Sequence, residues 1–178
     1  TRAIVKSLIE AGKKVVSVRH PMPYGDLEIQ KVQRFAAIED LVKHKCTIEE
    51  MEEYEPHIEM GSVIYSGVDY EAILREAEKE ADVIIWDGGN NDMPFYKPDL
   101  SYVVVDPLRP GHEISYYPGE VNLRMADVVV INKIDTAYPE DIDEVRENIR
   151  AYNPKAKIIE AASAVNVDNP EVILDKNV

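Results

Sequence analysis

The chain is poor in cysteine and has no long apolar run. Cys46 is the single cysteine among 178 residues, so an internal disulfide is excluded and a reducing, cytoplasmic setting is expected. No apolar stretch approaches the roughly 20 residues of a membrane-spanning helix, so no membrane role is expected. One cysteine and four scattered histidines also argue against the thiolate or histidine cluster of a metal-delivery protein.

Basic residues are scarce as well. The 20 Lys and Arg residues face 34 Asp and Glu residues, which gives a formal net charge of −14. Such a charge repels nucleic acids and anionic membrane surfaces, so no nucleic-acid partner is expected, whereas small phosphorylated ligands stay compatible with a local basic pocket. A hydrophobic content of 45% and this length predict one domain over residues 1–178.

A phosphate-binding loop of the form Gly-x-x-x-x-Gly-Lys-Ser/Thr is missing from the sequence. The nearest stretch, residues 11–14 (Ala-Gly-Lys-Lys), lacks the first glycine and the hydroxyl residue, and Gly12 is better explained as a helix C-cap. The amphipathic helix that begins at Thr1 is of the kind that follows such a loop. We therefore expect the loop upstream of residue 1 and read the chain as an internal piece of a longer protein, inactive by itself.

Short β-branched runs alternate with segments of helical periodicity, which predicts an α/β fold. We expect a three-layer sandwich with a mostly parallel sheet. Strands are expected at residues 14–18, 62–65, 83–86, 102–105, 128–131 and from 157. Helices are expected from residue 1, over 27–45, after the Thr47 and Glu50 capping box, after Asp69 and after Pro139. Residues 49–59, with His57, are expected on the solvated surface, as is His44.

The tetrapeptide Asn132-Lys133-Ile134-Asp135 directly follows the apolar run 128–131. A parallel strand hands its last residues to a ligand at this point. The Asp135 carboxylate can accept two N–H donors of a guanine edge, while the Lys133 stem covers the ring. The alternative is a polar loop in which Asp135 accepts backbone N–H groups. Ser163 lies in a later strand-end loop that would meet the same base through its backbone.

A second strand-end motif follows residues 83–86, where Asp87 precedes Gly88 and Gly89. A hydrophobic run ending in Asp and Gly is typical of the Walker B element, whose carboxylate serves Mg²⁺ directly or through water. Asp26 is a second candidate acid for the metal. The alternatives are a turn cap for Asp87 and a helix cap for Asp26. The two strand-end motifs together predict a P-loop NTPase-like core.

Three longer segments carry a family resemblance. They are residues 19–26 (Arg-His-Pro-Met-Pro-Tyr-Gly-Asp), 86–92 (Trp-Asp-Gly-Gly-Asn-Asn-Asp) and 117–127 (Tyr-Pro-Gly-Glu-Val-Asn-Leu-Arg-Met-Ala-Asp). In these segments the chain resembles the archaeal cyclic 2,3-diphosphoglycerate synthetases, a family similar to metallochaperone-type P-loop GTPases. The resemblance implies a ligase that uses ATP and Mg²⁺ to close 2,3-diphosphoglycerate into a ring through an intramolecular phosphoanhydride.

A substrate with two phosphates needs cations that hold the phosphates together. Arg19 and His20 follow one predicted strand, and Arg109 and His112 follow another. We expect the four side chains to bind substrate in one crevice, with Arg19, His20, Arg109 and Asp87 as the catalytic group. Solvated arginines, or arginines paired with nearby acids, are the alternative.

The two lines of evidence disagree on the nucleotide. The tetrapeptide favours guanine, because an adenine would leave Asp135 partly unpaired, whereas the family resemblance implies ATP. We adopt ATP with Mg²⁺ and keep GTP as the alternative. A metal-delivering GTPase, a regulatory nucleotide-binding module without turnover, and a homo-oligomeric state all stay open.

Overall fold

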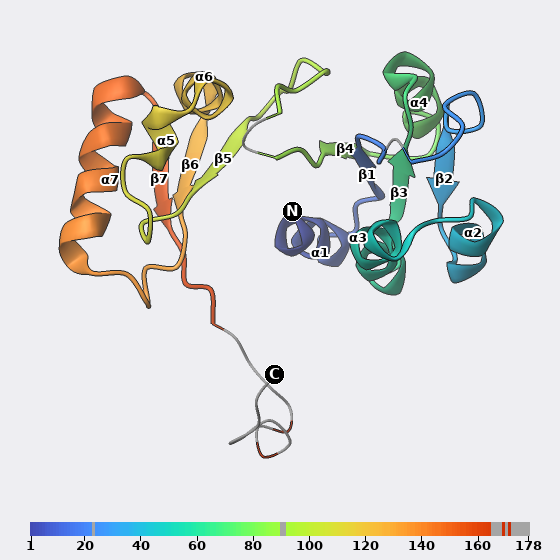
Figure 1. Ribbon diagram of the computed structural model, residues 1–178, viewed down its shortest axis with the longest axis horizontal. Coiled ribbons are helices and arrows are strands. Elements are labelled where there is room, and N and C mark those ends of the chain that lie inside the picture. Colours follow the sequence, from blue (N-terminus) through green and yellow to red (C-terminus); the bar gives the residue numbers. More distant parts are fainter. Residues whose placement is uncertain (23, 90–91, 165–168, 170, 172–178) are drawn as a thin grey trace. The chain divides into compact units, whose positions relative to one another are not determined.

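The computed structural model describes residues 1–22, 24–89, 92–164, 169 and 171. The chain forms two compact units, which Figure 1 shows in blue to green and in yellow to orange. Unit 1 is Thr1–Gly89 with Pro94–Lys97, and unit 2 is Asn90–Met93 with Pro98–Val178. Pro23, Asn90 and Asn91 of the motifs above lie outside the described residues. The predicted α/β class with mostly parallel sheets is confirmed; the single domain over residues 1–178 stays a prediction.

Unit 1 contains a four-stranded sheet in the order β2-β3-β1-β4. Its strands are β1 (Val15–Arg19), β2 (Gln33–Phe35), β3 (Val63–Ser66) and β4 (Val83–Trp86). Strand β1 pairs in parallel with both β3 and β4, and β2 pairs antiparallel with β3. The carboxyl ends of β1 and β4 therefore lie at the same edge of the sheet, which places Arg19 next to Asp87.

Helices cover both faces of this sheet. They are α1 (Arg2–Glu10), α2 (Ile38–Lys43), α3 (Ile48–Glu59) and α4 (Tyr70–Ala77). Neighbouring residues of a strand point to opposite faces, and Tyr65 packs with Ile73 of α4 while Ile64 packs with Tyr54 of α3. Helix, sheet and helix thus form three layers, as the sequence predicts.

The prediction of one helix over residues 27–45 is wrong. Residues 27–32 form turns, β2 follows, and only Ile38–Lys43 is helical. Phe35 is fully buried, and β2 gains its backbone hydrogen bonds by pairing with β3. Ile29, placed on the buried face of the expected helix, is 70% exposed. Sheet pairing outweighs a weak helical periodicity here.

The acidic helix α3 is not a purely solvated element, and His57 is not a surface residue. Glu50, Tyr54 and His57 recur at helical spacing and are buried, with His57 only 2% exposed. The expected capping box is present, since Thr47 accepts from the Glu50 N–H and Glu50 accepts from the Thr47 N–H. His44 is half-buried, with its ring edge-on to Phe35.

Unit 2 contains a three-stranded parallel sheet in the order β5-β6-β7. The strands are β5 (Tyr102–Val105), β6 (Val128–Ile131) and β7 (Lys157–Glu160), and the helices are α5 (His112–Ser115), α6 (Tyr117–Met125) and α7 (Pro139–Tyr152). One apolar core joins two alternating residues of β5 and two of β6 to Leu123 of α6 and to Val145 and Ile149 of α7; the strand residues are Val103, Val105, Val129 and Ile131. On the other face Val104 is 46% exposed.

The predicted helix C-cap at Gly12 is confirmed. Gly12 follows the end of α1 with a left-handed φ of +79°, and its N–H donates to the carbonyl oxygen of Ile9. In α6, Glu120 and Arg124 form an i,i+4 ion pair at 2.7 Å. Trp86 packs in an aromatic cluster with Tyr70, whose ring centroid lies 5.3 Å away. None of the described helices is long and apolar enough to cross a membrane.

Candidate functional site

Asp87 is the centre of a polar cluster at the carboxyl ends of β1 and β4. Its backbone N–H donates to Val18 of β1 at 2.8 Å. Its Oδ1 accepts a hydrogen bond from the Thr1 hydroxyl at the start of α1, and its Oδ2 accepts from Arg19 at 3.3 Å. The parallel pairing of β1 and β4 thereby brings Arg19 to Asp87, and the start of α1 brings Thr1 to the same carboxylate.

A cavity of about 270 Å³ opens at this cluster. Its lining comes from the start of α1, the end of β1, the end of β4 and one face of α3, and consists of Thr1, Arg2, Arg19, Glu52, Glu53, His57 and Asp87. Glu53 accepts from Arg19 at 2.6 Å, so the Arg19 guanidinium donates to two carboxylates. The cavity wall therefore mixes hard oxygen ligands with cations.

His57 closes the inner side of the cavity. Its Nε2 lies 4.0 Å from Asp87 Oδ2, and its Nδ1 lies 3.3 Å from the hydroxyl of the buried Ser17. Burial lowers the pKa of His57 below its ordinary value, against the opposing effect of the Asp87 charge. A neutral imidazole therefore faces the carboxylate.

The other two candidates of unit 1 lie apart from this cavity lining. His20 is half-buried, with Nδ1 3.4 Å from the carbonyl oxygen of Pro21. Asp26 is exposed and accepts from the Glu28 N–H at 2.9 Å. It therefore caps a turn, and the helix it was expected to cap does not form. The substrate role of His20 and the metal role of Asp26 stay predictions.

The tetrapeptide of residues 132–135 lies at the carboxyl edge of the unit 2 sheet, directly after β6. The N–H of Asn132 donates to Val105 at 3.0 Å, which ties the loop after β6 to β5. Asp135 accepts from the Ser163 N–H at 3.2 Å, which ties it to the loop after β7. This contact is the one expected under the alternative interpretation, in which Asp135 accepts a backbone N–H group. Base binding by Asp135 and Ser163 stays a prediction.

Lys133 lies over this edge in a left-handed conformation with φ +56°. Its Nζ donates to Asp106 Oδ2 at 2.6 Å. Burial raises the pKa of Asp106, but the hydrogen bond and charge of Lys133, with the Leu108 N–H, outweigh burial and hold that pKa below its ordinary value. The loops after all three strands are thus joined at the side where a base would bind.

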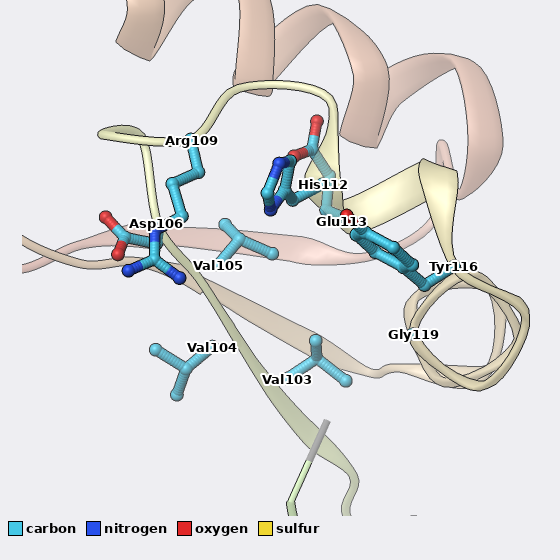
Figure 2. Close-up of a pocket in the computed structure, with 9 residues that line it drawn as sticks. All are labelled: Val103, Val104, Val105, Asp106, Arg109, His112, Glu113, Tyr116 and Gly119. Carbon is cyan, nitrogen blue, oxygen red and sulfur yellow. The ribbon is translucent and has the colours of Figure 1, made fainter. Parts of the chain in front are cut away.

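Arg109 and His112 line a second cavity, of about 350 Å³, beside β5. Figure 2 shows both side chains projecting from the segment after β5, with the Arg109 guanidinium near Asp106 and the His112 ring beside Glu113. His112 also packs edge-on to Tyr116, with ring centroids 5.3 Å apart. Arg109 and His112 are exposed, and their substrate role stays a prediction, as does a crevice shared with Arg19 and His20.

Five of the seven cavity residues were not among the sequence candidates: Thr1, Arg2, Glu52, Glu53 and His57. Tyr54, His57 and Ile58 follow the i, i+3, i+4 spacing of a buried helical face, which is the signal that identifies His57. No comparable pattern in the sequence identifies Glu53 or Thr1, because their roles depend on tertiary contacts. Within the described ranges, no three His, Cys, Asp or Glu side chains gather as a metal-holding group.

Comparison with known proteins gives three findings. Residues 59–162 match the family described as cyclic 2,3-diphosphoglycerate synthetase, P-loop domain. All 178 residues are 65% identical to arginine synthetase ArcE of Thermococcus kodakarensis, and they cover 40% of that protein. Over 86 residues the chain is 31% identical to the cyclic 2,3-diphosphoglycerate synthetase of Thermococcus sibiricus, covering 48% of this chain and 20% of that protein.

The fold also matches a solved structure. The crystal structure of the hydrogenase maturation factor HypB from Archaeoglobus fulgidus superposes with a TM-score of 0.54 at 17% identity, covering 90% of this chain and 74% of that one. This likeness shows the fold alone, and it confirms the predicted P-loop NTPase-like class. The chain spans less than half of the length of the two curated relatives.

Proposed function

The chain belongs to the cyclic 2,3-diphosphoglycerate synthetase P-loop domain family, and from this premise we propose that it is the nucleotide-binding part of an ATP- and Mg²⁺-dependent synthetase. The observation that carries the proposal is the contact of the Thr1 hydroxyl with Asp87 at the end of β4. A hydroxyl at the start of a helix and a strand-end carboxylate are the two protein groups that serve Mg²⁺ in P-loop sites.

The residues at this cavity fit a magnesium nucleotide. Mg²⁺ takes oxygen ligands and uses one or two protein groups together with nucleotide phosphates and water, so the lack of a larger carboxylate cluster agrees with the proposal. Arg19 would face the phosphates, since a guanidinium can bind two phosphate oxygens at once. When bound, Mg²⁺ offsets the charge that develops on the transferred phosphoryl group.

The base would be read in unit 2. Lys133 and Asp135 have the strand-end position of such a reader, and the Ser163 N–H marks where a base edge would meet Asp135. Guanine offers Asp135 two adjacent donors, whereas adenine offers only its exocyclic amino group beside the N1 acceptor and leaves Asp135 partly unpaired. We assign ATP as the nucleotide because of the family, with GTP as the alternative. Competition binding between ATP and GTP distinguishes the two.

We propose arginine as the product of the full-length protein, because the relative named arginine synthetase is 65% identical over the whole chain. Arginine differs from an amino acid with a ureido side chain by one nitrogen in place of oxygen. Transfer of the γ-phosphoryl group to the ureido oxygen would make that oxygen a leaving group. Attack of ammonia on the carbon would then release phosphate and leave a guanidino group, with ADP as the other product.

The charges of the cavity support this acceptor. Glu52, Glu53 and Asp87 line it together with Arg2 and Arg19, and Arg19 already donates to both Glu53 and Asp87. A neutral ureido group and ammonia suit such a wall, whereas two substrate phosphates beside those of the nucleotide require more cations than Arg2 and Arg19 supply. Closure of 2,3-diphosphoglycerate to its cyclic phosphoanhydride is the second candidate, supported by the family match and by the 31% identical relative.

The test is nucleotide turnover by the full-length natural protein. ADP and GDP release would be measured with Mg²⁺ and ATP or GTP, in the presence of citrulline and ammonium, of 2,3-diphosphoglycerate, or of neither. Arginine formed in step with ADP supports the first proposal, and a cyclic diphosphate signal in ³¹P NMR supports the second. GTP turnover indifferent to both substrates would indicate a GTPase, and binding without turnover would indicate a regulatory module.

A further inference from the structure

His57 is a buried histidine whose ring faces the Asp87 carboxylate. His57 is 2% exposed and belongs to α3, a helix with many acidic residues. Burying an imidazole costs free energy unless its polar nitrogens are satisfied. Ser17 Oγ lies 3.3 Å from Nδ1, whereas the group that faces Nε2 is the Asp87 carboxylate at 4.0 Å. The His57 ring thus has Ser17 of β1 beside Nδ1 and Asp87, at the end of β4, opposite Nε2.

The neighbours of the ring select its tautomer. Ser17 can donate or accept a hydrogen bond, so it is compatible with either form of a neutral imidazole. The anionic Asp87 is an acceptor and stabilises a proton on Nε2, whereas a lone pair on Nε2 would face the carboxylate charge. These neighbours favour the tautomer in which Ser17 donates to Nδ1 and the proton on Nε2 faces Asp87 Oδ2.

The two oxygens of Asp87 have different partners. Oδ1 accepts from the Thr1 hydroxyl on the side of α1. Oδ2 accepts from Arg19 and lies opposite His57. A carboxylate held through one oxygen keeps the other directed at the metal, and hydrogen bonds that are long without ligands shorten in the bound complex.

We infer that His57 is a positioning residue of the magnesium site, which holds the Asp87 carboxylate through Nε2–H so that its other oxygen meets the metal together with Thr1. This inference rests on the proposed nucleotide site. Arg19 shares the same oxygen, but a guanidinium also attracts the nucleotide phosphates. A neutral N–H orients the carboxylate without offsetting the negative charge that binds Mg²⁺.

The test uses two substitutions of His57, each of which replaces only one of the two ring nitrogens with a side-chain amide. In His57→Gln the side-chain amide can present an N–H where Nε2 lies, whereas the shorter amide in His57→Asn reaches the Nδ1 position and leaves Asp87 without this donor. The readout is the Mg²⁺ concentration that gives half-maximal binding of a fluorescent ATP analogue by the full-length protein. His44→Gln, at a half-buried histidine against Phe35, is the matched control.

His57→Asn is expected to raise the half-saturating Mg²⁺ concentration on the order of 10- to 100-fold. His57→Gln and His44→Gln should stay within about threefold of the natural protein, and nucleotide affinity without Mg²⁺ should change little in all three. Equal effects of Gln and Asn at position 57, or no effect of either, would overturn the inference and leave His57 a packing residue.

A second measurement does not depend on the variants folding. Nitrogen-detected NMR of the natural protein at pH 8 should assign His57 as the Nε2–H tautomer, and an Nδ1–H tautomer would overturn the inference. If the natural protein shows no Mg²⁺-dependent nucleotide binding, the proposed nucleotide site fails first. If it binds Mg²⁺ and nucleotide together but His57→Asn leaves the Mg²⁺ dependence unchanged, the positioning role alone fails.

Discussion

Replacing Asp87 by Asn should uncouple magnesium from nucleotide binding without unfolding the protein. The substitution preserves the size of the side chain and leaves one oxygen that can accept from Thr1 or from Arg19, but it removes the charge. The Asp87 side chain is 16% exposed and that of Arg19 is 27% exposed, so solvent screens their attraction. The free energy of unfolding should fall by only about 1 kcal/mol.

The effect on the metal should be larger than the effect on stability. Loss of a metal-site carboxylate is expected to weaken Mg²⁺ binding roughly 10- to 100-fold, which corresponds to about 1.4 to 2.7 kcal/mol. Nucleotide binding without Mg²⁺ should stay the same or become tighter, because Asp87 repels the phosphates when no metal is present. The sign of the Asp87→Asn effect on nucleotide affinity thus depends on the metal.

The assay is titration calorimetry of the full-length protein with ATP, with and without Mg²⁺, beside urea unfolding of each variant. Asp82→Asn is the matched control, because Asp82 precedes the opposite end of β4 and accepts from the Lys14 N–H at 2.9 Å. Asp82→Asn should leave the magnesium dependence unchanged. Equal magnesium dependence in Asp87→Asn and the natural protein would refute the assignment of Asp87 to the metal.

Three further predictions concern base recognition, backbone strain and acid stability. Asp135→Asn should lower the ratio of GTP to ATP affinity roughly 10- to 100-fold in competition binding, since two donors of guanine lose their carboxylate. Gly67→Ala should lower the free energy of unfolding in urea by at least about 2 kcal/mol, because a Cβ would lie 2.4 Å from the Lys31 carbonyl oxygen. Lys133 holds the pKa of Asp106 below its ordinary value of 3.8 despite burial, so this pair stabilises the fold above about pH 4 and the contribution disappears as the pH falls through the folded-state pKa. Asp106→Asn should flatten that acid-side loss in unfolding experiments.

Each of these three has a clear contrary outcome. Unchanged base preference in Asp135→Asn would place the base elsewhere. A stable Gly67→Ala would mean that the turn after β3 shifts away from Lys31 at little cost. An acid-side stability curve that is the same in Asp106→Asn and the natural protein would show that the pair with Lys133 persists in unfolded chains or contributes nothing measurable.

The sequence predicts strands and strand-end motifs well because their signals are local. The apolar runs of β4 and β6, followed by Asp87 and by the tetrapeptide 132–135, need no tertiary information. Residues 27–37 behave differently, since the antiparallel pairing of β2 with β3 depends on a partner 30 residues away. A weak helical periodicity in that stretch could not be distinguished from a short edge strand.

From the sequence, the residues of the site could be predicted only where a polar or charged residue lies at the end of a strand. Arg19 and Asp87 come together because β1 and β4 are parallel neighbours. The alternating pattern implies parallel strands that end at one edge, but it does not give the order of the strands. The contribution of α3 is different, because its acidic residues predict solvent exposure and conceal the buried face that carries His57. A helix with one buried face and many charges has the spacing of an amphipathic element, and that spacing is a better guide than its net charge.

Product analysis of the full-length protein tests the central claim most directly. The protein would be incubated with Mg²⁺, ATP, citrulline and ammonium, and ADP and arginine would be quantified together, with Asp87→Asn as the reference. The account predicts arginine and ADP in equal amounts and a large loss of both in Asp87→Asn. ADP release that is unaffected by Asp87→Asn would contradict the assignment of the nucleotide site, and ADP release without arginine would contradict the proposed product.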